Sequence, residues 1–193
     1  SSRSRARLVE VPVGTSVGEG LAGVRSEGDG PPRAVFLGGF AGGVWGTEAL
    51  DMPLHHDGMR ARGALLGCGA VVAIEDDDCV VSAAADIASY FEASSSQQCG
   101  SCVRGTQVFA RQLAAVADGT ADAEVLAALL RRAQSLPGGG NCAMPDAAAV
   151  LVRTLLTNFD TQLRAHLAAP CEICRVRTRS EPGRTRFRVE FDD

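Results

Sequence analysis

Residues 79–91 read CVVSAAADIASYF, and this stretch decides the fold. Its larger apolar residues recur at the spacing of one helical face: Val80, Ala84, Ile87 and Phe91. Positions three and four apart lie on the same side of an α-helix, so the stretch predicts a helix with one buried face. A polar Ser/Gln run at 94–98 ends the pattern.

The same helical pattern continues toward the C-terminus. The apolar positions are Val103, Val108, Leu113 and Val116, then Leu126, Leu129, Leu130 and Ala133, then Leu151, Leu155, Phe159, Leu163 and Leu167. Gly138–Gly140 interrupts the chain, and Pro145 stands where a first helical turn tolerates proline. We expect four helices over residues 76–170, the last of them long and continuous.

Residues 1–75 have a different composition, rich in valine, glycine and proline. Strands are predicted at 8–13, 34–37 and 69–74. Ser16 and Glu19 have the spacing of a capping box and predict a short helix after the first strand. The fold class is therefore α+β: a small unit over 1–75, a helical domain over 76–170, and a tail over 171–193.

Composition excludes several classes of function. The net charge is −4, and all 19 basic residues are arginine, so the chain lacks the basic character of a nucleic-acid binder. Arginines crowd only the tail, which we interpret as a solvated strand pair or a docking strip. No apolar run approaches the roughly 18 residues needed to span a bilayer, and no signal peptide is visible. We expect a cytoplasmic protein without nucleic-acid partners or direct membrane insertion. Because the chain does not begin with Met, we expect a fragment or a processed chain.

The seven cysteines cannot all pair, and without an export signal reduced thiols holding metal are favoured. Cys99 and Cys102 form a C-x-x-C pair ahead of a helix, and Cys142 precedes the final helix. Helix starts favour thiolates, so three sulfurs from two such loops can meet at an iron–sulfur cluster. Two alternatives stay open on the residues alone. One is a zinc site completed by Cys171 and Cys174, and the other is no metal.

Other candidate groups have simpler interpretations. Cys68 and Cys79 flank the third predicted strand and are expected to be small buried apolar residues. His166 is expected on the polar side of the last helix. No Ser-His-Asp or Cys-His set and no dinucleotide-binding glycine motif is present, so no complete active site is expected in this chain.

Six short motifs resemble a known family in order and spacing. They are VPVGT at 11–15, FLGG at 36–39, LDMPL at 50–54, LGCGAV at 66–71, QCGSCVRGT at 98–106 and NCAMPDAA at 141–148. From Leu8 to about Leu167 the chain resembles the C-terminal part of the NADH-binding flavoprotein subunit of respiratory complex I. Related NAD-linked hydrogenase and formate dehydrogenase subunits contain the same region.

The resemblance implies a β-grasp-like domain of the soluble-ligand-binding (SLBB) type followed by a helical domain with a [4Fe–4S] cluster. The family holds its cluster with C-x-x-C-x-x-C and a fourth cysteine about forty residues later. Here Ser96 stands at the first position, with Cys99, Cys102 and Cys142 at the others. Either Ser96 ligates through oxygen, or the cluster is a three-iron form, or another cysteine replaces the missing ligand. We favour Cys171, with Cys174 as the weaker candidate.

The family's flavin- and NADH-binding domain would precede residue 1. FMN and NADH are therefore expected only if such a domain exists, and this chain alone would be part of an NADH dehydrogenase-type oxidoreductase. The resemblance implies an electron relay from a flavin-containing domain or subunit to other iron–sulfur subunits. It also implies a location in the cytoplasm or at the periphery of a membrane-bound complex. The competing interpretation is a cluster-free or zinc-stabilised structural or interaction module.

Overall fold

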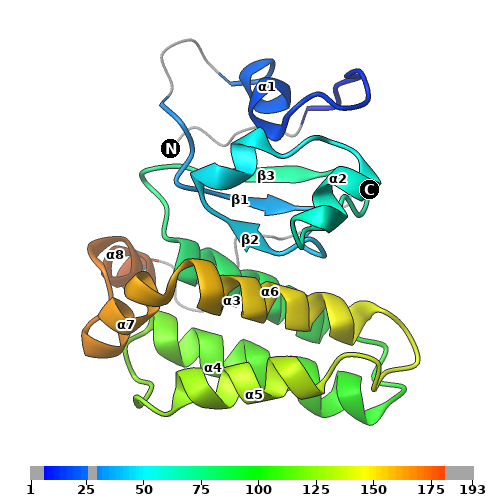
Figure 1. The fold of residues 1–193 in the computed structure, drawn as a ribbon. Helices are drawn as coiled ribbons and strands as arrows, with labels where there is room; N and C mark the ends of the chain where they lie inside the picture. The colour runs from blue at the N-terminus through cyan, green and yellow to red at the C-terminus, as the bar shows by residue number, and fades with distance from the viewer. Residues whose placement is uncertain (1–6, 26–29, 181–193) are drawn as a thin grey trace, which may run out of the picture.

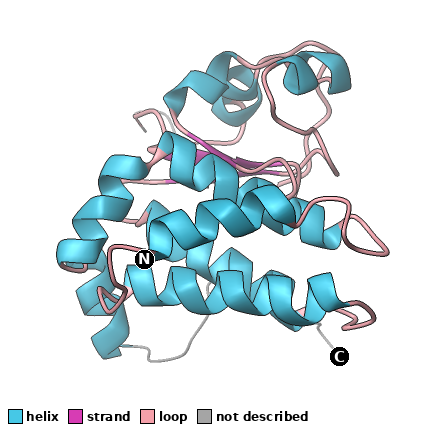
Figure 2. Cartoon of the chain, turned by 60° about the horizontal axis from the view of Figure 1, so that its bottom comes forward, coloured by secondary structure: helices cyan, strands magenta, loops and turns pink. Residues whose placement is uncertain are grey.

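The computed structural model describes residues 7–25 and 30–180. A small sheet lies between short N-terminal helices and a layer of longer helices (Figures 1 and 2). The N-terminal elements are α1 (Val17–Ala22), β1 (Ala34–Leu37), β2 (Val44–Trp45), the 3₁₀ helix η1 (Thr47–Asp51), α2 (His56–Ala61) and β3 (Val71–Ile74). The C-terminal elements are α3 (Val80–Ala93), the π-helical η2 (Ser101–Thr106), α4 (Gln107–Ala117), α5 (Val125–Ser135), α6 (Met144–Asn158), α7 (Asp160–Ala168) and α8 (Glu172–Ser180).

The sheet is antiparallel in the order β2-β1-β3, with Val35 opposite Trp45 and Phe36 opposite Val72. Successive side chains of a strand point to opposite faces, so β1 feeds two hydrophobic cores. Ala34 and Phe36 pack with the long helices, whereas Val35 and Leu37 pack with α1 and η1. The central strand is therefore buried on both sides.

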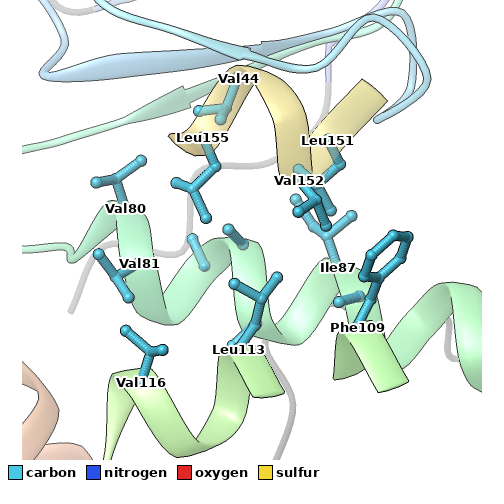
Figure 3. Packing of buried hydrophobic residues seen from close by; sticks show 14 of the residues in the cluster. Val44, Val80, Val81, Ile87, Phe109, Leu113, Val116, Leu151, Val152 and Leu155 are labelled. Atoms are coloured by element: carbon cyan, nitrogen blue, oxygen red, sulfur yellow. The ribbon is translucent and has the colours of Figure 1, made fainter. Parts of the chain in front are cut away.

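Helix α3 is the centre of the helical layer. Ten of its 14 residues are buried, because α4 and α6 cover it from different sides. Figure 3 shows Val81 and Ile87 of α3 among Leu113 of α4 and Leu151 of α6. The small alanines of α3 allow this close packing, and the predicted helix over the opening stretch is confirmed.

Helix α6 is joined to the sheet by polar contacts. The hydroxyl of Thr154 accepts a hydrogen bond from the Val44 amide at 2.9 Å, and the Asn158 side chain donates to the Val44 carbonyl at 3.0 Å. Gly43, at φ +81°, makes the approach close: a Cβ there would lie 2.5 Å from the Thr154 hydroxyl. The strand edge and the helix therefore form one body.

The predicted α+β class is confirmed, as are the strands at β1 and β3 and the Ser16–Glu19 capping box of α1. The strand predicted at 8–13 is wrong, because Leu8 and Val13 are exposed and form no ladder. The final helix is not continuous. It breaks at Phe159 (φ −131°), and α7 takes a new direction.

In the tail, residues 172–180 form α8 and not a strand. The tail arginines beyond Ser180, including Arg184, Arg186 and Arg188, lie outside the described residues. Within 7–25 and 30–180, no helix is both long and apolar enough to cross a bilayer.

Candidate iron–sulfur site

Cys99 and Cys102 lie at the start of η2, the wide helical turn that continues into α4. Turns of this kind are rare and concentrate at functional sites. The Thr106 hydroxyl donates to the Cys102 carbonyl at 2.6 Å, which satisfies a backbone acceptor of the widened turn. Gly105 allows the turn to approach the end of α5, since a Cβ there would lie 2.7 Å from the Leu136 side chain.

Cys142 is carried by the second loop, directly ahead of α6. The Ser101 hydroxyl donates to the Gly139 carbonyl at 2.7 Å and so fastens the two loops together. The Gly138 amide donates to the Asp146 carboxylate at 3.0 Å, which holds the glycine segment against the first turn of α6. Two loops that are 38 residues apart in sequence are thereby brought side by side.

The surroundings of Cys99 favour its thiolate. Its pKa is lowered first by the Asn141 amide, which comes from the Cys142 loop, and then by the amide of Cys102. Hydrogen bonds from backbone amides to sulfur stabilise the charged form, and this is the form that binds metal.

Cys102 is buried, and its pKa is raised. The Ser95 hydroxyl lowers it, but burial and the neighbouring sulfurs of Cys99 and Cys142 raise it by more in total. The three predicted cysteine ligands lie on two loops that the Ser101–Gly139 hydrogen bond holds together.

The loop before Cys99 contains Ser96, which the motif spacing aligns with the first ligand of the family, and its neighbour Ser95. Ser95, which sequence reasoning passed over, places its hydroxyl on Cys102. The backbone carbonyl of Ser96 accepts from the Gln98 side chain at 3.3 Å. Aligning this chain with the family motif without gaps assigns ligands by position along the sequence alone. The loop before Cys99 turns at Gln97 (φ +55°), so position along the sequence does not say which serine is near the sulfurs.

Cys171 does not join these residues. It lies with Cys79, His166 and Cys174, and the ligand atoms of these four residues lie within 4.8 Å of one another. Cys79 immediately precedes α3, while Cys99 follows that helix, whose 14 residues span about 21 Å. Figure 1 shows α7 and α8 at one end of the helical layer and the loop before α6 at the other. Helix α6 begins just after Cys142 and runs toward the other end of the layer, so Cys171 lies away from the cluster loops and not beside Cys99 as we expected.

Two further expectations change at this end. His166 is not on a polar face: it is buried, with 5% of its surface exposed. Cys79 is buried as expected but faces polar neighbours, and Cys68 is exposed. The sequence signal that could have identified the group is the spacing His166-x₄-Cys171-x₂-Cys174, a dense Cys/His cluster.

The donor set of Cys99, Cys102 and Cys142 fits an iron–sulfur cluster. Thiolates are the ligands such clusters use, and amide donors at the sulfurs tune their potential. The two fastened loops carry three thiols, and the Ser95 hydroxyl lies beside that of Cys102.

Residues 82–166 match the family model described as the NADH-ubiquinone oxidoreductase-F iron-sulfur binding region. The chain is 30% identical over 163 residues to the NADH-quinone oxidoreductase F 2 subunit of Rhizobium meliloti (strain 1021), covering 83% of the chain and 38% of that relative. It is 32% identical over 101 residues to NADP-reducing hydrogenase subunit HndC of Solidesulfovibrio fructosivorans, covering 49% of the chain and 19% of that relative.

A similar solved structure is the NAD+-reducing [NiFe]-hydrogenase in the air-oxidized state. The TM-score is 0.72 at 27% identity, over 84% of this chain and 27% of that one. The chain therefore spans less than two fifths of the length of these relatives.

Proposed function

Since the chain belongs to the family of NADH-quinone oxidoreductase F-type subunits and corresponds to their C-terminal, iron–sulfur-binding part, we propose that it is an electron-transfer module with a cluster on Cys99, Cys102 and Cys142. One observation supports the proposal. The Ser101 hydroxyl fastens the two cysteine-bearing loops together, and the Asn141 amide of the Cys142 loop stabilises the Cys99 thiolate.

The cluster supplies one-electron chemistry when bound, and the chain's own residues do the rest. Cys99, Cys102 and Cys142 hold it, and the amides at Cys99 set its charge environment. Burial of Cys102 removes water from one side. No acid, base or nucleophile is needed for this role.

The fourth iron position is assigned to a serine oxygen, with Ser95 ahead of Ser96 because its hydroxyl contacts Cys102. A three-iron cluster with no fourth ligand is the other form that this donor set accommodates. Either form differs from the four-thiolate set that the motif spacing of the family implies.

We assign the remaining machinery to partners. Relatives named as NADH-quinone oxidoreductase and NAD+-reducing hydrogenase subunits extend well beyond the region matched here. A flavin-containing domain or subunit, with FMN and NADH, would reduce the cluster, and other iron–sulfur subunits would accept its electrons. Such a complex would lie in the cytoplasm or at the periphery of a membrane.

We also propose a division of the chain at residues 1–75, 76–170 and 171–193. The first unit is proposed as a β-grasp of the soluble-ligand-binding type, supported by its small sheet with α1 against one face. The second is a helical cluster domain built on α3, η2 with α4, α5 and α6. The competing function, a cluster-free or zinc-stabilised interaction module, is favoured by the serine at the first ligand position.

The test is anaerobic purification of the full chain with iron and sulfide analysis. We expect a brown protein that contains iron and acid-labile sulfide, in equal amounts for a four-iron cluster and with less iron than sulfide for a three-iron form. Cys99→Ala, Cys102→Ala and Cys142→Ala should each lose it, whereas Cys68→Ala, an exposed cysteine outside both groups, should retain it. Ser95→Ala and Ser96→Ala would identify the fourth ligand. A colourless wild-type chain that binds no iron on reconstitution would instead support the interaction module.

A further inference from the structure

Four potential metal ligands meet at the end of the helical layer opposite the cluster loops. They are Cys79, His166, Cys171 and Cys174, and three of them are buried. The His166 Nε2 atom lies 3.4 Å from the Cys79 sulfur and 3.6 Å from the Cys174 sulfur. All four ligand atoms lie within 4.8 Å of one another.

These distances are those of ligands around a single ion. With bonds of about 2.3 Å to sulfur and about 2.0 Å to nitrogen, a tetrahedral zinc ion holds sulfur and nitrogen about 3.5 Å apart and two sulfurs about 3.8 Å apart. A polynuclear cluster places several irons and sulfides between its ligands, which separates them further. The group therefore fits one ion and not a second cluster.

The imidazole of His166 is already oriented for coordination. Its Nδ1 atom lies 2.8 Å from the Gln162 carbonyl, one turn earlier in α7. A carbonyl only accepts, so Nδ1 carries the hydrogen, and in the neutral ring Nε2 presents its lone pair to the sulfurs. A histidine that ligates through one nitrogen and donates from the other to a backbone carbonyl is the usual outer arrangement of a zinc ligand.

The elements that carry these ligands are held in place independently. Arg177 of α8 donates to the Asp86 carboxylate of α3 at 2.7 Å and also to the Ser82 hydroxyl. Gly119, at φ +67°, lets the chain at Pro170 pass so closely that a Cβ would lie 2.5 Å from the proline ring. Helix α8 is thereby fastened to the start of α3 by contacts that do not involve the four ligands.

A reactive thiolate–imidazole pair is the other chemistry that such residues offer. A hydrogen bond from Cys174 and, to a smaller extent, His166 lower the pKa of Cys79 to about 3, although burial acts to raise it. The pKa of His166 is raised to about 9, chiefly by its hydrogen bond with Cys79. However, Cys79 is only 6% exposed and Cys174 only 3%. A substrate cannot reach a nucleophile enclosed in this way, whereas a zinc ion fits between the four ligand atoms.

We propose that Cys79, His166, Cys171 and Cys174 form a structural zinc site that binds one Zn²⁺ and fixes α7 and α8 to the start of α3. Three thiolates and one imidazole with no open position are a known set for structural zinc. The ion would cross-link residues that are 95 positions apart, at the point where the tail leaves the helical domain.

Metal content of the full chain, measured by mass spectrometry after anaerobic purification, tests the proposal. Wild type and Cys68→Ala should each hold one zinc ion per chain. The zinc content of Cys174→Ala and His166→Ala should be at least tenfold lower. Cys142→Ala should keep its zinc while losing iron, so failure of this site and failure of the cluster are separable. Zinc that is unchanged in Cys174→Ala and His166→Ala relative to Cys68→Ala overturns the proposal.

Because those two positions are buried, a second measurement guards against misfolding. The metal-free wild-type chain is titrated with Co²⁺, whose absorption reports tetrahedral geometry and thiolate ligands. We expect an equimolar tetrahedral spectrum that Zn²⁺ displaces and that weakens in Cys171→Ala, the partly exposed ligand. A titration without that spectrum, a mononuclear iron at the site, or a disulfide between these cysteines after anaerobic purification would each refute the assignment.

Discussion

Thr154 is the single residue on which contact between the sheet and α6 most depends. Its buried hydroxyl accepts from the Val44 amide and donates within its own helix, to the Val150 carbonyl at 2.9 Å. Thr154→Val conserves the shape but leaves the Val44 amide without its acceptor. Because a buried donor without a partner costs about 1–3 kcal/mol, we expect a loss of about 2 kcal/mol in the free energy of unfolding.

Urea unfolding of Thr154→Val checks this value. Thr154→Ser retains the hydroxyl and should lose only the smaller contribution of one methyl group, about 1 kcal/mol. Equal unfolding free energies for wild type and Thr154→Val would show that the Val44 amide finds another acceptor.

At the residue scale, the sequence predicted three cluster ligands that stay a prediction, and a fourth, Cys171, that the structure places in the other group. Cys99, Cys102 and Cys142 are visible because their spacing and their places before helices have chemical meaning. The place of Cys171 is not visible, because it depends on the direction in which α6 runs from Cys142 and on the turn after that helix. Spacing along a chain carries no information about such turns.

At the scale of elements, the two cluster loops are joined by the Ser101 hydroxyl on the Gly139 carbonyl. Ser101→Ala removes that hydrogen bond without touching a cysteine. A hydrogen bond worth about 1 kcal/mol corresponds to about a fivefold change in how often the loops separate. We therefore expect the cluster absorbance to bleach in air about five times faster than in wild type. A bleaching rate unchanged from that of wild type would mean that the loops are held together by other contacts.

Helix α1 provides a prediction on pH. The pKa of Glu19 is lowered from 4.5, first by the backbone of Ser16 and then by its hydroxyl. A carboxyl whose folded pKa is depressed stabilises the fold fully above its unfolded pKa, and loses that contribution as the pH falls through the lower folded value. The difference in unfolding free energy between wild type and Glu19→Gln should therefore shrink on acidification below about pH 4.5. Urea titrations at several pH values measure it, and a constant difference would contradict the role of the carboxylate.

Elements were predictable where local pattern and burial agree. The face of α3, the strands β1 and β3 and the capping box of α1 are such cases. The strand predicted at 8–13 had the pattern but found no partner. Conversely, β2 is only two residues long and forms because it pairs with β1, so no periodic pattern in the sequence predicted it. Tertiary contact decided both.

At the scale of the whole molecule, the two proposed metal sites lie toward opposite ends of α3, a helix about 21 Å long. Sites so distant, with no shared ligand, behave additively. The double variant Cys142→Ala/Cys174→Ala should therefore lose iron and zinc to the same extents as the two single variants. If Cys174→Ala alone also abolished iron binding, the two ends would be coupled through α3.

The order of the sheet unit and the helical unit was predictable from the resemblance. The group of Cys79, His166, Cys171 and Cys174 was not, since the family motifs do not include it.

The central claim is that Cys99, Cys102 and Cys142 hold a polynuclear iron–sulfur centre. X-ray absorption at the iron edge on the anaerobically purified chain tests it most directly. We predict a sulfur-dominated first shell and a second iron close to each iron, with both lost in Cys142→Ala. An iron with no iron neighbour, or a cluster signal that Cys142→Ala leaves intact, would contradict the account.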